Sequence, residues 1–315
     1  MALILVGTAS WTDSSLIKSG QFYPRDCKSP EDRLRFYAAN FEIVEVDSSY
    51  YALPSAANAV KWAERTPENF VFNVKAYRAL TGHQTPKASF PKDLLAALGD
   101  VAASTKKTNL YYKDLPPEIR DELWKRFIAG IQPLQAAGKL GALHFQFAPW
   151  VTYGPKAMAH IEDCAARLPG MTLAVEFRHR SWFEPQNRQA TLEFETARKL
   201  VNVTVDEPQG FENCIPAVWD VTNPELAILR LHGRNHGTWN DKSAQASSDR
   251  FNYEYSDEEL DELAEAIAAL VRNGVKNIHV IFNNNYGNQG QKNAAQLVAK
   301  LSLRLPRQRK ENIGE

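Results

Sequence analysis

The fold can be read outward from residues 41–51, which run FEIVEVDSSYY. Val44 and Val46 alternate with Glu45 and Asp47, and successive side chains of a strand point to opposite faces of a sheet. The segment is therefore predicted to be a strand with one apolar face and one polar face. Two tyrosines follow it directly, so the polar face ends beside aromatic rings.

Short apolar runs of this kind recur along the chain, with helical periodicity between them. The predicted strands are residues 2–8, 41–47, 70–76, 140–147, 173–179, 201–206, 226–232 and 277–283. The predicted helices are residues 31–41, 56–65, 121–137, 156–168, 189–200, 257–272 and 292–301. Strands that alternate with helices pair in parallel, because each return to the same sheet needs a crossover. Eight such units predict an α/β fold, a single closed (β/α)8 barrel of the TIM type.

The predicted barrel fills residues 1–305 as one domain, and residues 306–315 are expected to form a flexible tail. The sixth helix is expected to be short or irregular, because residues 210–220 have little helical period. Long loops are expected after strands 3 and 7, at residues 77–117 and 234–255. Loops of such length in a compact domain are often functional.

Composition narrows the class of protein. Lysine plus arginine and aspartate plus glutamate both total 37, so the chain lacks the overall basic charge that drives non-specific binding to duplex DNA. The three cysteines lie far apart and outside any CxxC spacing, which favours a reducing compartment. The apolar start, residues 2–6, lacks a basic leader and is too short to span a membrane. A cytoplasmic protein without a membrane partner is expected.

The polar faces of the strands are predicted to converge. One face of each strand is apolar, whereas the other becomes polar toward the end of the strand. In a closed barrel the second face is the interior, and its last residues open on the carboxyl-terminal mouth, where barrel enzymes keep their active sites. The expected interior residues are Thr8, Ser10, Glu45, Asp47, Asn73, Lys75, His144, Gln146, Glu176, Arg178, Thr204, Asp206, Arg230, His232 and Asn283.

These residue types suggest an anion site with acid–base groups beside it. Arginine can hold a phosphate or carboxylate through two bonds, lysine adds a point charge, and histidine is the best proton carrier by its ordinary pKa. The candidate catalytic residues are Glu45, Glu176, Asp206 and His232. The candidate substrate-binding residues are Lys75, Gln146, Arg178, Arg230 and Asn283, together with the aromatic residues Trp11, Tyr50 and Trp182.

The same residues allow other interpretations. Charges inside a barrel can form a satisfied network of ion pairs with no catalytic purpose. Glu45 and Glu176 could be the two facing carboxylates of a glycosidase. A divalent metal could be held by Glu45, Asp47, Glu176, Asp206 and His232. No local spacing such as HExxH supports a metal, so the cofactor is left undetermined and a metal is not favoured.

A set of motifs runs along nearly the whole chain in a specific order. It comprises Gly7 to Trp11, Phe22 to Pro24, Phe41 to Tyr51, Phe70 to Lys75, Phe145 to Phe147, Glu176 to His179, Ser181 with Trp182, Asp206 with Pro208, Arg230 to Gly233, and Phe282 to Asn284. Together these motifs resemble the YecE-like family, domain of unknown function 72. The resemblance implies a TIM-type barrel but no established reaction. The chain departs from the family pattern at Asp47, where asparagine is more common, at Ala148 and in residues 110–125.

We expect an enzyme that acts by acid–base chemistry on a phosphorylated or other anionic substrate, with a nucleotide or a nucleic-acid end among the options. Hydrolase, lyase and isomerase chemistry all stay open. One alternative is a non-catalytic protein that binds a nucleic-acid fragment or a small anion in the same pocket. Another is a carbohydrate-active barrel. Nothing in the sequence sets the oligomeric state.

Overall fold

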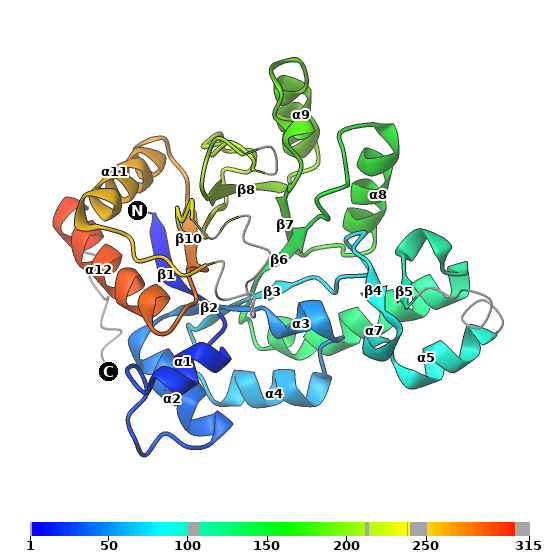
Figure 1. Cartoon of the computed structure of the whole chain (residues 1–315), viewed down its shortest axis with the longest axis horizontal. Helices are drawn as coiled ribbons and strands as arrows, with labels where there is room; N and C mark the ends of the chain where they lie inside the picture. Colours follow the sequence, from blue (N-terminus) through cyan, green and yellow to red (C-terminus); the bar gives the residue numbers. More distant parts are fainter. Residues whose placement is uncertain (1, 100–107, 212–213, 238, 240–250, 306–315) are drawn as a thin grey trace, which may run out of the picture.

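A closed barrel of parallel strands lies at the centre of the molecule (Figure 1). The computed structural model describes residues 2–99, 108–211, 214–237, 239 and 251–305. The barrel order is β1-β10-β9-β8-β7-β6-β3-β2. The strands are β1 (Leu3–Ala9), β2 (Ile43–Val46), β3 (Val71–Lys75), β6 (Leu140–Gln146), β7 (Thr172–Glu176), β8 (Val201–Asp206), β9 (Ala227–Leu231) and β10 (Asn277–Phe282). The predicted (β/α)8 barrel is confirmed, while the predicted tail, residues 306–315, lies outside the described residues.

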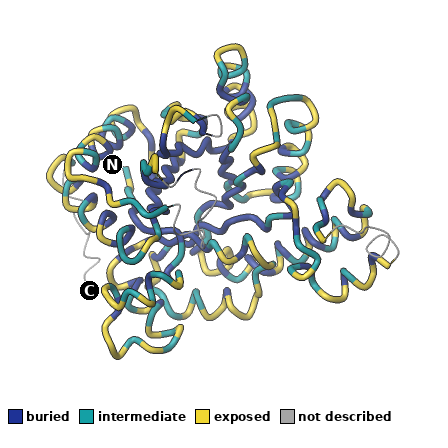
Figure 2. Tube along the Cα trace, viewed as in Figure 1, coloured by how far each residue is buried: buried dark blue, intermediate teal, exposed yellow. Residues whose placement is uncertain are grey.

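Helices surround the barrel, and the trace in Figure 2 is dark blue for buried residues at the centre and largely yellow or teal for exposed or intermediate residues around it. The longer ones are α2 (Pro30–Asn40), α4 (Ala56–Glu64), α7 (Pro117–Ala136), α8 (Pro155–Ala166), α9 (Pro185–Ala197), α11 (Asp257–Arg272) and α12 (Gln289–Arg304). The shorter ones are α1 (Ser14–Ser19) and α3 (Ser48–Tyr51). Ser29 and Ser256 form capping boxes that fix the starts of α2 and α11. None of the helices in the described ranges is long and apolar enough to cross a membrane.

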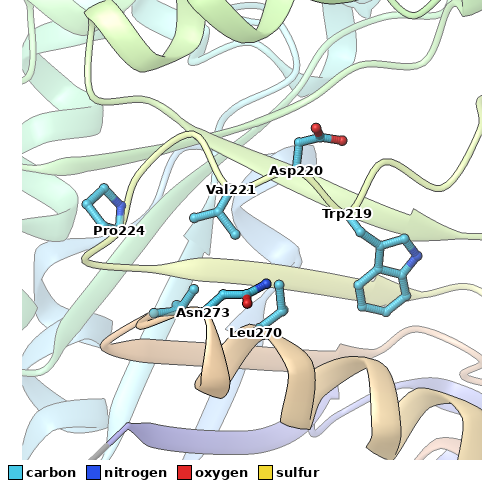
Figure 3. Close-up of a pocket in the computed structure, with 7 residues that line it drawn as sticks. Trp219, Asp220, Val221, Pro224, Leu270 and Asn273 are labelled. Carbon is cyan, nitrogen blue, oxygen red and sulfur yellow. The ribbon is translucent and has the colours of Figure 1, made fainter.

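The connection between β8 and β9 contains no helix in its described residues, 207–211 and 214–226, as expected for the irregular sixth unit. Polar side chains of β8 form hydrogen bonds with the backbone of this segment instead. The Thr204 hydroxyl donates to the Val218 carbonyl at 2.7 Å, and the Asn202 amide donates to the same carbonyl at 3.3 Å. An open pocket lies beside the segment, lined by Trp219, Asp220, Val221, Pro224, Leu270, Asn273 and Val275 (Figure 3). These residues precede β9 and β10, so the pocket lies at the opposite end of the barrel from the mouth.

The two predicted long loops follow β3 and β9. The first leaves the barrel and forms a small antiparallel pair, β4 (Thr85–Pro86) with β5 (Asn109–Leu110). It also carries α5 (Lys92–Ala97) and the 3-10 helices η1 (Lys87–Ser89) and η2 (Tyr112–Asp114), at the edge of the molecule (Figure 1). A further 3-10 helix, η3 (Arg180–Trp182), follows β7. The second loop has neither helix nor strand in its described residues, 232–237, 239 and 251–256.

The strand faces agree with the prediction except in β1 and β8. Strand register places Arg230 beside Val205 and Glu176 beside Gln146, so Val205 points inward and its neighbours Thr204 and Asp206 point outward. The predicted interior placement of Asp206 and Thr204 is therefore wrong. The outward residues have polar partners there, because Thr204 hydrogen-bonds the irregular backbone between β8 and β9, and Asp206 binds Arg234.

In β1 the interior face also differs from the prediction. Leu5 and Ala9 pack inside the barrel with Ile43 and Ile281. Thr8 instead faces the helices, where its hydroxyl lies 3.0 Å from the Tyr37 hydroxyl of α2. Apolar side chains thus fill this part of the barrel interior, with Ala9 and Ile281 beside Glu45 and Arg230 in the strand register, and the predicted inward position of Thr8 is wrong.

Candidate functional site

Arg230 lies at the centre of the barrel between two carboxylates. Its Nη2 is 2.7 Å from Glu45 Oε1, and its Nη1 is 2.8 Å from Glu176 Oε2. The two ring nitrogens of His144 each lie 3.1 Å from an oxygen of Glu45 or Glu176. None of these four side chains is more than 1% exposed. We call Glu45, His144, Glu176 and Arg230 the Arg230 network.

The charges of the Arg230 network hold its carboxylates in the ionised form. Burial alone would raise the pKa of Glu45 and of Glu176, but the Arg230 guanidinium and the adjacent His144 outweigh it. The pKa of both carboxyls therefore lies below its ordinary value. A general acid must carry a proton at the working pH, which neither carboxyl does here. The network matches the interpretation of an ion-paired cluster, although Arg230 Nε and His144 Nδ1 have no hydrogen-bond partner.

Arg178 forms the next layer toward the mouth. Its Nη1 lies 2.8 Å from Glu207 Oε2 and 3.4 Å from Glu176 Oε1, and its guanidinium stands 5.9 Å from the ring of Trp239. Glu207 also accepts a hydrogen bond from the Ile215 amide at 2.9 Å. Burial raises the pKa of Glu207 in spite of Arg178. The side chain of Arg178 keeps 12% exposure, so part of it reaches the mouth.

His232 lies beside the Arg230 network and is held from both sides. Asn283 Nδ2 is 2.8 Å from its Nδ1, and Glu176 Oε1 is 3.6 Å from its Nε2. The Phe251 ring lies 5.4 Å from the imidazole. Burial lowers the pKa of His232 to about 3, against the opposing effect of Glu176, so the ring is neutral at ordinary pH. Gln146, at the same level, accepts a hydrogen bond from Arg230 Nη1 at 3.3 Å.

Two further cations gather around Tyr50 at the mouth. Lys75 Nζ lies 4.8 Å from the center of the Tyr50 ring, and the Arg78 guanidinium lies 5.1 Å from it. Lys75 is paired with Asp47 at 2.7 Å. Arg78 is half-buried, its Nε has no hydrogen-bond partner, and no carboxylate of the described residues forms an ion pair with it. We call Lys75, Arg78 and Arg178 the mouth cations.

His83 lies close to the mouth cations, although it was not among the residues predicted from the sequence. Its ring contacts Tyr50 edge to face at 5.2 Å between centroids, and its Nδ1 lies 2.9 Å from the Thr81 hydroxyl. Burial lowers the pKa of His83 to about 3, and the three mouth cations act in the same direction. The imidazole is therefore neutral and 6% exposed beside a positive group of side chains.

Three of the predicted site residues lie away from the mouth. Asp206 points outward from β8, where it binds Arg234 at 2.8 Å and accepts a hydrogen bond from the Tyr255 hydroxyl at 2.7 Å. Trp11 packs against Trp62 in the outer core at 5.7 Å between ring centroids. Trp182 is fully buried in the same layer, outside the barrel. Apolar packing thus accounts for two aromatic residues that were expected to line the pocket.

The whole chain can now be compared with known proteins. The family model described as a protein of unknown function, DUF72, matches residues 5–313. The chain belongs to the DUF72 family. The Bacillus subtilis UPF0759 protein YunF is 30% identical to this DUF72 protein over 303 residues, which make up 96% of the chain and 95% of YunF. The Escherichia coli UPF0759 protein YecE is 24% identical over 204 residues, 64% of the chain and 58% of YecE.

Solved structures agree with the DUF72 assignment. The crystal structure of a DUF72 family protein from Enterococcus faecalis has a TM-score of 0.75 and 26% identity, covering 95% of both chains. A DUF72 family protein from Thermotoga maritima has a TM-score of 0.73 and 28% identity, covering 95% of this chain and 99% of its own. The expected YecE-like membership and barrel fold are confirmed.

The described residues of the DUF72 barrel contain no arrangement of side chains that would form a metal-binding site. No three histidine, cysteine, aspartate or glutamate side chains in those ranges are arranged to hold an ion. Of the five predicted ligands, Asp206 points out of the barrel and Asp47 is paired with Lys75. Glu45 and Glu176 are already bound by Arg230. The metal alternative therefore gains no support from the side-chain geometry.

Proposed function

We propose that this DUF72 protein is an enzyme that binds a phosphorylated or otherwise anionic substrate at the barrel mouth, with the mouth cations as its anion contacts. Arg78 carries the proposal. It is a cation at the mouth that forms no ion pair within the described residues, although its Nε is buried. A buried charged donor without a partner is costly, so an incoming oxyanion would gain more here than at a paired arginine.

His83 is the proposed proton carrier of this site. Burial and the mouth cations lower the pKa of His83, so that its imidazole is neutral at ordinary pH. An anion among these cations would offset their charge and raise the pKa of His83 toward its ordinary value. The imidazole would then accept a proton more readily with substrate bound than without it, which couples binding to acid–base chemistry.

The residues chosen from the sequence divide into two roles in this proposal. Lys75 and Arg178 contact the anion, while Gln146, Asn283 and His232 line the floor beneath it and Tyr50 supports the cations. The carboxylates Glu45 and Glu176, with Arg230, fix the floor and carry no proton. Asp206 has no role in the site. The proposed location is the cytoplasm, on the support of the cysteine content.

A panel of phosphate esters tests the proposal. The wild-type protein is expected to turn over at least one class of phosphorylated compound, and His83→Asn should lose turnover while it keeps its affinity for inorganic phosphate. His236→Asn, an exposed histidine in the loop after β9, is the matched control and should behave as wild type. The proposal is contradicted if inorganic phosphate and phosphate esters all fail to bind.

A non-catalytic anion-binding protein is the second candidate. The observation that favours it is that Glu45 and Glu176 are both bound by Arg230, because neither of these two predicted catalytic carboxylates is then available as a base. Binding of phosphate esters without turnover, unchanged in His83→Asn, would favour this candidate over the enzyme.

The carbohydrate-active alternative is weaker on the same geometry. A glycosidase needs one carboxyl with a raised pKa to protonate the leaving group. Glu45 and Glu176 share one arginine, and the pKa of both lies below its ordinary value. Neither is suited to be that acid.

A further inference from the structure

Trp150 is a large aromatic side chain that stands at the mouth and stays 49% exposed. It follows β6 by four residues, on the same side of the barrel as the mouth cations. Leaving an indole ring in water forgoes the stabilisation that its burial would bring. A fixed and exposed tryptophan beside a ligand site therefore calls for a partner that covers it.

Three contacts fix the indole without covering it. The indole N–H donates to the Gly82 carbonyl at 3.1 Å. Gly82 has a φ of 78°, a left-handed conformation that favours glycine. The rings of His83 and Tyr111 meet the indole edge to face, at 5.9 and 6.5 Å between centroids. The ring is thus held in one orientation before any ligand arrives.

His83 links this ring to the anion contacts. Its ring touches Trp150 on one side and Tyr50 on the other, at 5.9 and 5.2 Å. Lys75 and Arg78 stand over Tyr50 at 4.8 and 5.1 Å. A ligand that spans this row would meet cations at one end and an exposed aromatic face at the other.

We infer that Trp150 is the stacking platform for the base of a nucleoside phosphate whose phosphate is held by the mouth cations. The inference rests on the proposed anion site and adds the substrate class. Every nucleobase has a flat face that stacks on tryptophan, and its phosphate supplies the charge that the cations require. A neutral sugar would use the ring but not the cations. A free nucleotide and the phosphorylated end of a single strand both present these two groups, a base and a phosphate.

Calorimetric titration with four probes separates the contributions of the phosphate, the sugar and the base to binding. The probes are inorganic phosphate, ribose phosphate, adenosine monophosphate and a short oligothymidylate phosphorylated at its end. Adenosine monophosphate should bind wild type about 5- to 150-fold more tightly than ribose phosphate, the range for stacking of one base. Trp150→Ala should remove this difference and leave the affinity for ribose phosphate unchanged, and Trp150→Phe should restore most of it.

Tyr286→Ala is the matched control. Tyr286 is an exposed aromatic residue after β10, at 41% exposure, and its removal should change neither affinity. Tighter binding of the oligonucleotide than of adenosine monophosphate assigns the ligand to a nucleic-acid end, and the reverse assigns it to a free nucleotide.

Two results would overturn the inference. One is equal affinity of wild type for adenosine monophosphate and ribose phosphate. The other is binding of a neutral oligosaccharide that depends on Trp150. In either case phosphate binding by the mouth cations would survive, whereas failure of all four probes to bind would instead overturn the proposed function itself.

Discussion

The Arg230 network and the mouth cations are both groups of charged side chains in the upper half of one barrel, but their charges are satisfied differently. Arg230 is fully buried and has a carboxylate on each side, at 2.7 and 2.8 Å. Arg78 is half-buried and has no ion-pair partner within the described residues. The difference teaches that charge inside a barrel points to a ligand only where the protein itself has not already neutralised it.

The largest effect on stability is expected from a substitution that breaks the Arg230 network. Arg230→Met removes the cation from between two buried carboxylates, which loses both ion pairs and leaves uncompensated charge. The free energy of unfolding, measured in urea, should fall by about 3 to 5 kcal/mol. Adding Glu45→Gln and Glu176→Gln to this variant should recover part of the loss. A loss below about 1 kcal/mol would show that the network is not held as described.

Acid should destabilise the protein before its carboxylates titrate. Folding lowers the pKa of His83 and His232 to about 3 and that of His279 to about 4, mainly through burial. The unfolded value is about 6.5, so the stability that each neutral imidazole contributes is complete above that pH and is lost as the pH falls toward the folded pKa. One such histidine should cost about 2 kcal/mol between pH ~6.5 and ~5.

Urea unfolding at a series of pH values measures this loss. His83→Asn should flatten the slope, because it removes one of the groups that must become protonated. His236→Asn, at an exposed position, should leave the slope unchanged. If stability were constant from pH ~6.5 to ~5, the imidazoles would not be buried in the neutral form.

A smaller effect comes from Glu195 of α9, a buried carboxyl that lacks the cation given to Glu45. Neither of its oxygens has a hydrogen-bond partner, and burial raises its pKa well above the ordinary value. The penalty is absent below the unfolded pKa and grows as the pH rises. Glu195→Gln should therefore increase the free energy of unfolding at pH ~8 by about 1 kcal/mol, with little gain at pH ~4. The exposed Glu193→Gln on the same helix is the control, and an equal gain in both variants would contradict the account.

Sequence alternation predicted the barrel and most of its interior, because a period of two is a property of the strand itself. Glu45, Lys75, Glu176, Arg230 and His232 all face inward as expected. The error at Asp206 arose from a property that alternation does not encode, since the outward face of β8 is polar as well and Asp206 there binds Arg234. Assigning Val205 and its alternate neighbours to the interior would also have placed Glu207 inside, where it binds Arg178.

The remaining differences concern residues outside the strands. Trp11 and Trp182 follow strands closely but pack into the outer core, which a position in sequence does not reveal. His83 lies in the long loop after β3, where no regular alternation of polar and apolar residues indicates which way a side chain points. Its place beside Tyr50 depends on how that loop folds back over the mouth. A site built from loops is therefore less predictable than its barrel floor.

The central claim is that Arg78, the mouth cation without an ion pair within the described residues, is available to an anion, whereas the Arg230 network is not. Calorimetric titration of inorganic phosphate into wild type and Arg78→Ala tests it most directly, with the exposed Arg35→Ala on α2 as control. Arg78→Ala should lose about 10- to 100-fold in affinity, the worth of one charged hydrogen bond, while its unfolding free energy changes by less than about 1 kcal/mol. Unchanged phosphate affinity in a folded Arg78→Ala variant, or no phosphate binding by wild type, would contradict the claim.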